Sequence, residues 1–168
     1  MMYKSGGMGL ETKYAKGTLK VKKALENLGY ELIIKEMPES TRTAVEAANA
    51  IGCSLEQIVK SLVFMLKDSE RPVMIIASGP NRVDEKLFNK LLGEKLVKAD
   101  ADFVLEHTGY SIGGVSPVGL KNHLDIYIDQ DLMAYEEIWA AAGTPKSVFR
   151  LTPDILKEIT GGKLVRVN

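Results

Sequence analysis

Residues 60–77 read KSLVFMLKDSERPVMIIA and contain two apolar runs, 60–66 and 73–77, each as long as a typical β-strand. Residues 68–72 lie between the runs and combine charged side chains with Ser69 and Pro72, a composition typical of a turn. Two apolar runs that flank such a turn favour antiparallel pairing. We therefore predict a β-hairpin in the middle of the chain.

Helices and strands also alternate before this hairpin. We predict a helix over 16–28, a strand over 30–37, a helix over 44–51 and a helical turn over 54–58. Gly29 and Gly52 follow the two longer helices as stop residues, and Pro38 ends the strand. Thr43 and Glu46 have the spacing of a capping box, which indicates where the second helix begins.

The same alternation continues after the hairpin. The predicted segments are a helix over 83–92, a strand near 96, a helix over 101–107, a loop over 109–119, strands over 124–129, 138–142 and 147–151, a helix over 153–160 and a strand over 164–167. The last helix opens with Thr152 as its N-cap and Pro153 as its first residue.

This order of segments indicates the fold class. Helices and strands interleave without a strict βαβ rhythm, so we predict an α/β or α+β fold with a mixed, mostly antiparallel sheet and surrounding helices. Residues 16–168 should form one compact domain. Residues 1–15 contain several glycines and no apolar core, so we predict a flexible leader and not a signal peptide.

The overall composition narrows the function classes. Among the 168 residues, 22 Lys and Arg balance 22 Asp and Glu, so the formal net charge is zero. This balance argues against a non-specific nucleic-acid coat and against DNA as a partner, but it allows one basic site that holds the end of an RNA. A single cysteine, Cys53, with His107 and His123 predicts no disulfide, no metal site and a reducing cytoplasm. No apolar run has the length of a membrane span.

Lys60 stands at the head of a very apolar strand, where an unpaired buried ammonium is costly. One interpretation is a lysine that extends its charge to solvent at a strand end. The other is a cation that faces a pocket and holds a phosphate or a carboxylate. The position alone leaves both open.

The glycine-rich loop 109–119 offers backbone N–H groups that can cradle a phosphate or an oxyanion, although it could also be an ordinary long turn. Its glycines match neither a P-loop nor G-x-G-x-x-G, and no G-x-S-x-G motif occurs. Cys53 is expected to be a buried thiol, and His107 to lie in the last turn of a helix. The acids Asp125, Asp129 and Asp131 could form a metal or glycosidase pair, but strand-face solvation and a turn explain them more simply.

Four segments together resemble the YbaK / prolyl-tRNA synthetase-associated editing-domain family. They are 40–48 (STRTAVEAA), 58–64 (IVKSLVF), 109–119 (GYSIGGVSPVG), and Ala142-Gly143 followed by 149–156 (FRLTPDIL). The likeness covers roughly 18–167. The pairing of the lysine-bearing strand with a G-x-x-x-P loop, in that order, is specific.

This resemblance implies a sheet curled around a pocket and an enzyme that hydrolyses the ester of a mischarged aminoacyl-tRNA without a cofactor. It implies a trans-acting enzyme whose substrate is tRNA for proline carrying a small non-cognate amino acid. The partners would be the 3′ end of the aminoacylated tRNA and, as a second candidate, an aminoacyl-tRNA synthetase; no membrane is involved.

The family's essential strand lysine matches Lys60, and its G-x-x-x-P loop matches Gly113 and Pro117. The amides near Gly113 and Gly114 can meet the oxyanion. The residues expected to contact substrate are Thr41, Thr43, Ser61, Ser116 and Gly143, although both threonines could instead cap the helix. Because no protein nucleophile or base is evident, the substrate's own hydroxyl is expected to assist.

Two other functions remain open at this level. The fold could serve as a non-catalytic module that binds the tRNA end or a synthetase. It could also be a small-molecule ester or amide hydrolase, although no nucleophile motif supports this. The presence of Lys60 together with Gly113 and Pro117 favours the editing enzyme.

Overall fold

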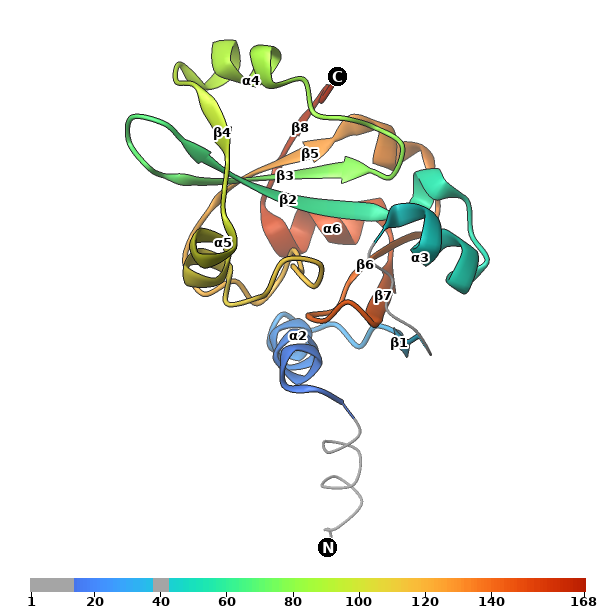
Figure 1. Ribbon diagram of the computed structural model, residues 1–168. Helices are drawn as coiled ribbons and strands as arrows, with labels where there is room; N and C mark the ends of the chain where they lie inside the picture. Colours follow the sequence, from blue (N-terminus) through green and yellow to red (C-terminus); the bar gives the residue numbers. More distant parts are fainter. Residues whose placement is uncertain (1–13, 38–42) are drawn as a thin grey trace, which may run out of the picture.

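The computed structural model describes residues 14–37 and 43–168; the predicted leader, apart from its last two residues, and Thr41 lie outside them. The predicted hairpin forms from β2 (Val59–Leu66) and β3 (Pro72–Ser78), with Val59 opposite Ser78. It is the centre of a five-stranded sheet in the order β4-β2-β3-β5-β8 (Figure 1). The remaining strands are β4 (Leu96–Lys98), antiparallel to β2, β5 (Asp125–Asp129), parallel to β3, and β8 (Lys163–Val165), parallel to β5.

The other strands form a separate antiparallel sheet in the order β1-β7-β6, so the strands make two sheets and not one. Its members are β1 (Ile34–Glu36), β6 (Ile138–Ala141) and β7 (Ser147–Leu151). A bridge between Ile58 and Trp139 joins it to the start of β2. Strand β1 is shorter than the predicted 30–37, and its three residues pair with Ser147–Phe149 of β7. The mixed α/β fold class is confirmed.

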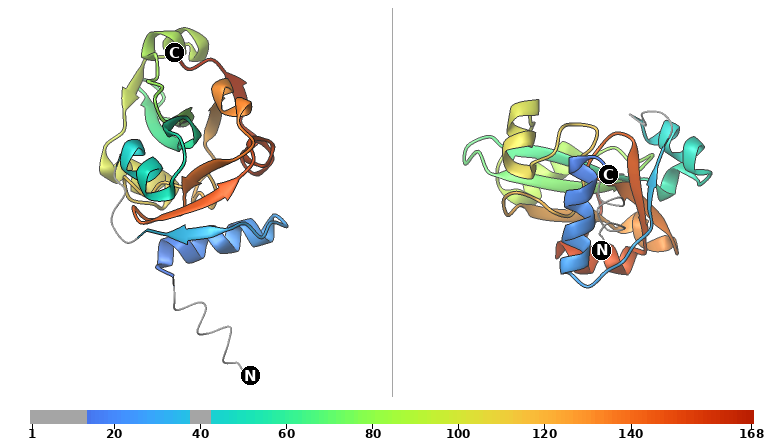
Figure 2. Two further views of the ribbon diagram at one scale, coloured as in Figure 1. Left: turned by 90° about the vertical axis from the view of Figure 1, so that its right-hand side faces the viewer. Right: turned by 90° about the horizontal axis from the view of Figure 1, so that it is seen from below.

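Within residues 14–37 and 43–168, five α-helices surround the sheets: α2 (Lys16–Asn27), α3 (Ala44–Ile51), α4 (Glu85–Leu92), α5 (Ala101–Thr108) and α6 (Pro153–Thr160). The short 3-10 helix η1 (Leu55–Gln57) connects α3 to β2, and η2 (Gln130–Ala134) connects β5 to β6. The predicted capping box of Thr43 and Glu46 is present, and Thr152 caps α6. Helix α2 lies beside the smaller sheet (Figure 2). No helix in the described part of the chain is long and apolar enough to cross a membrane.

Strand β3 is buried on both faces and divides the core into two layers. Met74 and Ile76 pack into the layer that contains α2, α5 and α6, whereas Val73 and Ile75 pack into the layer that contains Phe88 of α4. Each fully buried side chain of this size contributes roughly 1.5–3 kcal/mol. The hairpin is therefore the rigid support on which the site described next is built.

Candidate active site

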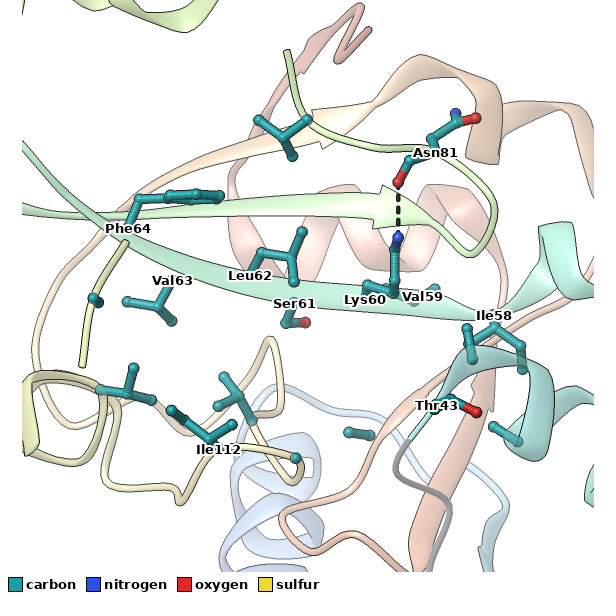
Figure 3. Close-up of a pocket in the computed structure, with 18 of the residues that line it drawn as sticks. Thr43, Ile58, Val59, Lys60, Ser61, Leu62, Val63, Phe64, Asn81 and Ile112 are labelled. Atoms are coloured by element: carbon teal, nitrogen blue, oxygen red, sulfur yellow. Dashed lines mark hydrogen bonds between the residues drawn. The ribbon is translucent and has the colours of Figure 1, made fainter. Parts of the chain in front are cut away.

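A cavity of about 730 Å³ opens along the outer edge of β2. Strand β4 pairs only with Phe64–Leu66, so the first half of β2 has no partner strand on that side among the described elements. The cavity is bounded by this edge, by the loop around Gly113, by the segment after β3, and by the start of α3 and the β6–β7 turn (Figure 3). Side chains from both faces of β2 therefore reach it.

Lys60 points toward the segment that follows β3. Its Nζ donates a hydrogen bond of 2.7 Å to the backbone carbonyl of Asn81 (Figure 3). Burial lowers the pKa of Lys60, the charge of Arg82 lowers it further, and the carboxylate of Asp129 raises it. Lys60 lines the cavity, and its amine is held by this hydrogen bond.

Asn81 is held in turn by two carboxylates. Its side-chain amide donates to Oδ2 of Asp129 and to Oδ2 of Asp131, both at 2.8 Å, and Asp129 also accepts the Ser78 N–H at 3.0 Å. Asp129 is only 1% exposed, so the expectation of solvated acids on this strand is wrong for it. It anchors the segment that carries the Lys60 acceptor.

Within the described residues, no three His, Cys, Asp or Glu side chains come together as metal ligands.

Ser61 lies on the opposite face of β2 from Lys60, because successive strand residues alternate in direction (Figure 3). It lines the same cavity, on the side of the loop that carries Ile112. Its Oγ is buried and has no hydrogen-bond partner, the single such side-chain atom in the part of the chain that the structure describes.

The two glycines of the loop have different surroundings. Gly113 has a φ of 96°, lines the cavity, and its N–H meets no acceptor among the described residues. The N–H of Gly114 donates to the carbonyl of Ser111 at 3.0 Å, and a Cβ there would lie 2.7 Å from the Thr144 backbone. Gly114 is thus a packing glycine whose amide is already engaged, which leaves Gly113 as the free donor.

Several other expected site residues lie away from the cavity. Ser116 and Pro117 are buried in the loop, where the Ser116 Oγ faces the Val118 N–H at 3.4 Å. Gly143 packs against Gly17 of α2, leaving no room for a side chain at either position. Neither Ser116, Pro117 nor Gly143 borders the cavity. Thr43 does line it while also capping α3.

Besides Asn81 and Glu85, four polar residues of the cavity were not singled out from the sequence. Arg82 and Lys98 line it and form no ion pair or hydrogen bond among the described residues. Thr144 and Ser147 line the opposite side, with their hydroxyls 2.6 Å apart. The Ser147 Oγ also bonds the buried Thr18 hydroxyl at 2.8 Å. Among these four residues, only Arg82 carried a signal in the sequence, because it lies in the short segment between a predicted strand and a predicted helix.

Neither Cys53 nor His107 borders the cavity. Cys53 is half-buried beside α3 and therefore less buried than expected, and its partial burial raises the pKa of its thiol, which disfavours a thiolate nucleophile. His107 occupies the last turn of α5.

The chain is similar to several known proteins in sequence and in fold. The chain is 34% identical over 131 residues to the uncharacterised protein YwhH of Bacillus subtilis, which covers 78% of this chain and 83% of that protein. It is 28% identical over 130 residues to EbsC of Enterococcus faecalis, a candidate Cys-tRNA(Pro)/Cys-tRNA(Cys) deacylase, covering 77% and 79%.

A crystal structure of a candidate trans-editing enzyme for prolyl-tRNA synthetase superposes with a TM-score of 0.87 at 42% identity, covering 92% of this chain and 98% of that one. A sequence model of the aminoacyl-tRNA editing domain matches residues 38–159, a span that includes β2, the loop 109–119 and the strands of the smaller sheet except β1. The chain therefore belongs to the aminoacyl-tRNA editing domain family.

Proposed function

We propose that this protein is an aminoacyl-tRNA deacylase that acts in trans and hydrolyses the ester of a mischarged tRNA, with tRNA for proline carrying a small non-cognate amino acid as its substrate. The observation that carries the proposal is a single cavity that both Lys60 and the free amide of Gly113 border. Membership of the editing-domain family and the likeness to a candidate trans-editing enzyme for prolyl-tRNA synthetase support it. That likeness also makes the synthetase a candidate partner.

The charges around the cavity suit the end of an RNA. Lys60, Arg82 and Lys98 line it, against Glu85 as the single carboxylate among the described lining residues. A chain with zero net charge thus concentrates positive charge at one place. Charge-assisted hydrogen bonds from such cations to phosphate or ribose oxygens would position the terminal adenosine.

The described cavity lining contains no cysteine or histidine that could act as nucleophile or base. We therefore assign the attack to a water molecule that the neighbouring hydroxyl of the terminal ribose orients. Water adds to the ester carbonyl, the bond from the carbonyl carbon to the ribose oxygen breaks, and the water proton passes to that oxygen. The Gly113 N–H would stabilise the oxyanion, and one such donor is worth about 2.7–4 kcal/mol in other hydrolases.

A panel of charged tRNAs tests this proposal. tRNA for proline carrying alanine, cysteine, serine or proline is incubated with the full chain in the presence of a chelator, and the release of amino acid is followed. We expect release of at least one non-cognate amino acid and retention of proline.

Three outcomes would contradict parts of the proposal. Turnover that the chelator abolishes and zinc restores would disprove independence from metal. Tight binding of every charged tRNA without turnover would make the protein a non-catalytic binding module. Hydrolysis of simple esters but of no aminoacyl-tRNA would make it a small-molecule esterase.

A further inference from the structure

The unpaired hydroxyl of Ser61 is the feature that the proposed chemistry does not use. Its Oγ is buried against the cavity and meets no donor or acceptor of the described protein. A buried hydroxyl without a hydrogen-bond partner is energetically unfavourable. A ligand with a polar group at this position would form that hydrogen bond, and an apolar ligand would not. Ser61 thus favours a polar group at this place in the cavity.

The walls around Ser61 are apolar and uncharged. Val59 and Val63, which share its face of β2, pack in the same cluster as Val104 of α5 and Val115 of the loop. Lys60 lies on the other face, where Leu62 packs with the α4 layer (Figure 3). A charged side chain in this compartment would lose its water without gaining a counterion, whereas a small neutral side chain would fit.

The other hydroxyls of the cavity do not compete for this role. Thr144 and Ser147 are hydrogen-bonded to each other at 2.6 Å, and Ser147 also bonds Thr18. Ser61 alone among the described lining residues has a buried side-chain oxygen without a partner. A ligand hydroxyl can both donate to and accept from it, which a thiol does only weakly.

We propose that Ser61 is a specificity-determining residue that hydrogen-bonds the side-chain hydroxyl of the amino acid being removed. The preferred substrates are then esters of serine or threonine, not of alanine. This inference rests on the proposed deacylase function. The walls of Val63 and Val115 would contact the carbon atoms of such a side chain.

The test compares seryl and alanyl esters on the same tRNA for proline, with wild-type protein and with Ser61→Ala. We expect wild-type kcat/KM to favour the seryl ester by about tenfold, the effect of roughly one well-made hydrogen bond. Ser61→Ala should remove this preference, so that kcat/KM for the seryl ester falls about tenfold relative to kcat/KM for the alanyl ester. Ser61→Thr keeps a hydroxyl and should keep the preference.

Binding provides a second measurement that needs no turnover. Non-hydrolysable seryl and alanyl amides of adenosine are titrated into the same proteins. The seryl amide should bind more tightly than the alanyl amide to the wild-type protein and to Ser61→Thr, whereas Ser61→Ala should bind the two equally. Equal losses for both amino acids in that variant would place Ser61 against the ester or the α-amine and overturn the inference, as would a wild-type protein that hydrolyses only the alanyl ester. Absence of hydrolysis for every aminoacyl-tRNA would instead disprove the proposed function.

Discussion

At the scale of single residues, the charge of Lys60 is the feature on which activity should depend most. We expect Lys60→Ala to lower kcat/KM at least tenfold, because a hydrogen bond to a charged group contributes about 1.5–3 kcal/mol. The fold should persist, since the side chain makes one protein hydrogen bond and is partly exposed. Single-turnover deacylation measures the loss of activity, and the melting temperature shows whether the fold persists.

Lys90→Ala, on the exposed side of α4, is the matched control for the loss of a lysine charge. It should leave both the rate and the melting temperature near wild type. A Lys60→Ala variant with a wild-type rate would remove Lys60 from the site, and one that unfolds would make the residue structural.

Asp129 acts on the same residue from a buried position. Its carboxylate raises the pKa of Lys60, so Asp129→Asn should lower that pKa, because the ammonium loses a favourable charge. The cationic form would then disappear at lower pH, and the alkaline limb of the kcat/KM profile should move toward neutral pH. The profile is measured with spontaneous ester hydrolysis subtracted, and a carbon NMR titration of the Lys60 Cε reports the pKa directly.

Asp125→Asn is the control for this effect. Asp125 lies on the same strand but at the surface, where its Oδ2 is 3.6 Å from a guanidinium nitrogen of Arg71. Its removal should leave the alkaline limb in place. A uniform fall in activity at every pH for Asp129→Asn, with no movement of the limb, would show that Asp129 only supports the fold.

At the scale of elements, the loop 109–119 places two neighbouring glycines in opposite roles. Gly113→Val should reduce turnover more than stability. A valine at the positive φ of Gly113 costs about 1–3 kcal/mol of backbone strain. Its Cβ causes no clash, because the nearest atom, Pro145 Cγ, lies 3.6 Å away. Its side chain would stand at the cavity and tilt the free amide. Loss of an oxyanion donor would cost about 2.7–4 kcal/mol of barrier.

Gly114→Val provides the contrast, because its Cβ would meet the Thr144 backbone at 2.7 Å. It should lower the melting temperature markedly, and the residual folded protein should keep its rate at low temperature. Melting temperature and deacylation rate are measured on both variants. If Gly113→Val lost stability and kept its rate, the loop would be a turn without a catalytic role.

At the scale of the whole molecule, α2 is joined to the smaller sheet by two facing glycines. A Cβ on Gly17 would meet the Gly143 carbonyl, and the Thr18–Ser147 hydroxyl pair lies beside this contact. Replacement of glycine by alanine within a helix normally raises the free energy of unfolding by up to about 1 kcal/mol. We expect Gly17→Ala to do the opposite and lower the free energy of unfolding by about 1–3 kcal/mol, because the helix must move away.

Urea denaturation measures this change, with Lys16→Ala, at an exposed neighbour in the same turn, as the control. A more stable Gly17→Ala protein would show that the close approach of α2 to the β6–β7 turn is not maintained in solution.

Local sequence determined most of the elements. The β2–β3 hairpin, the capping box of Thr43 and Glu46 and the start of α6 at Thr152 and Pro153 depend on neighbours within a few residues, so their patterns are readable in one dimension. The motifs around Lys60 and Gly113 likewise indicated the family, and both residues border the cavity.

The alternation of a strand already implies that Lys60 and Ser61 lie on opposite faces of β2. Only the tertiary structure decided which distant segments meet at the candidate site and beside it: it supplies the acceptor of the Lys60 amine and the packing partner of Gly143. The division into two sheets likewise follows from which strands pair. These features arise from long-range packing, in which the partner of a residue depends on the path of the whole chain, so no local pattern could have indicated them.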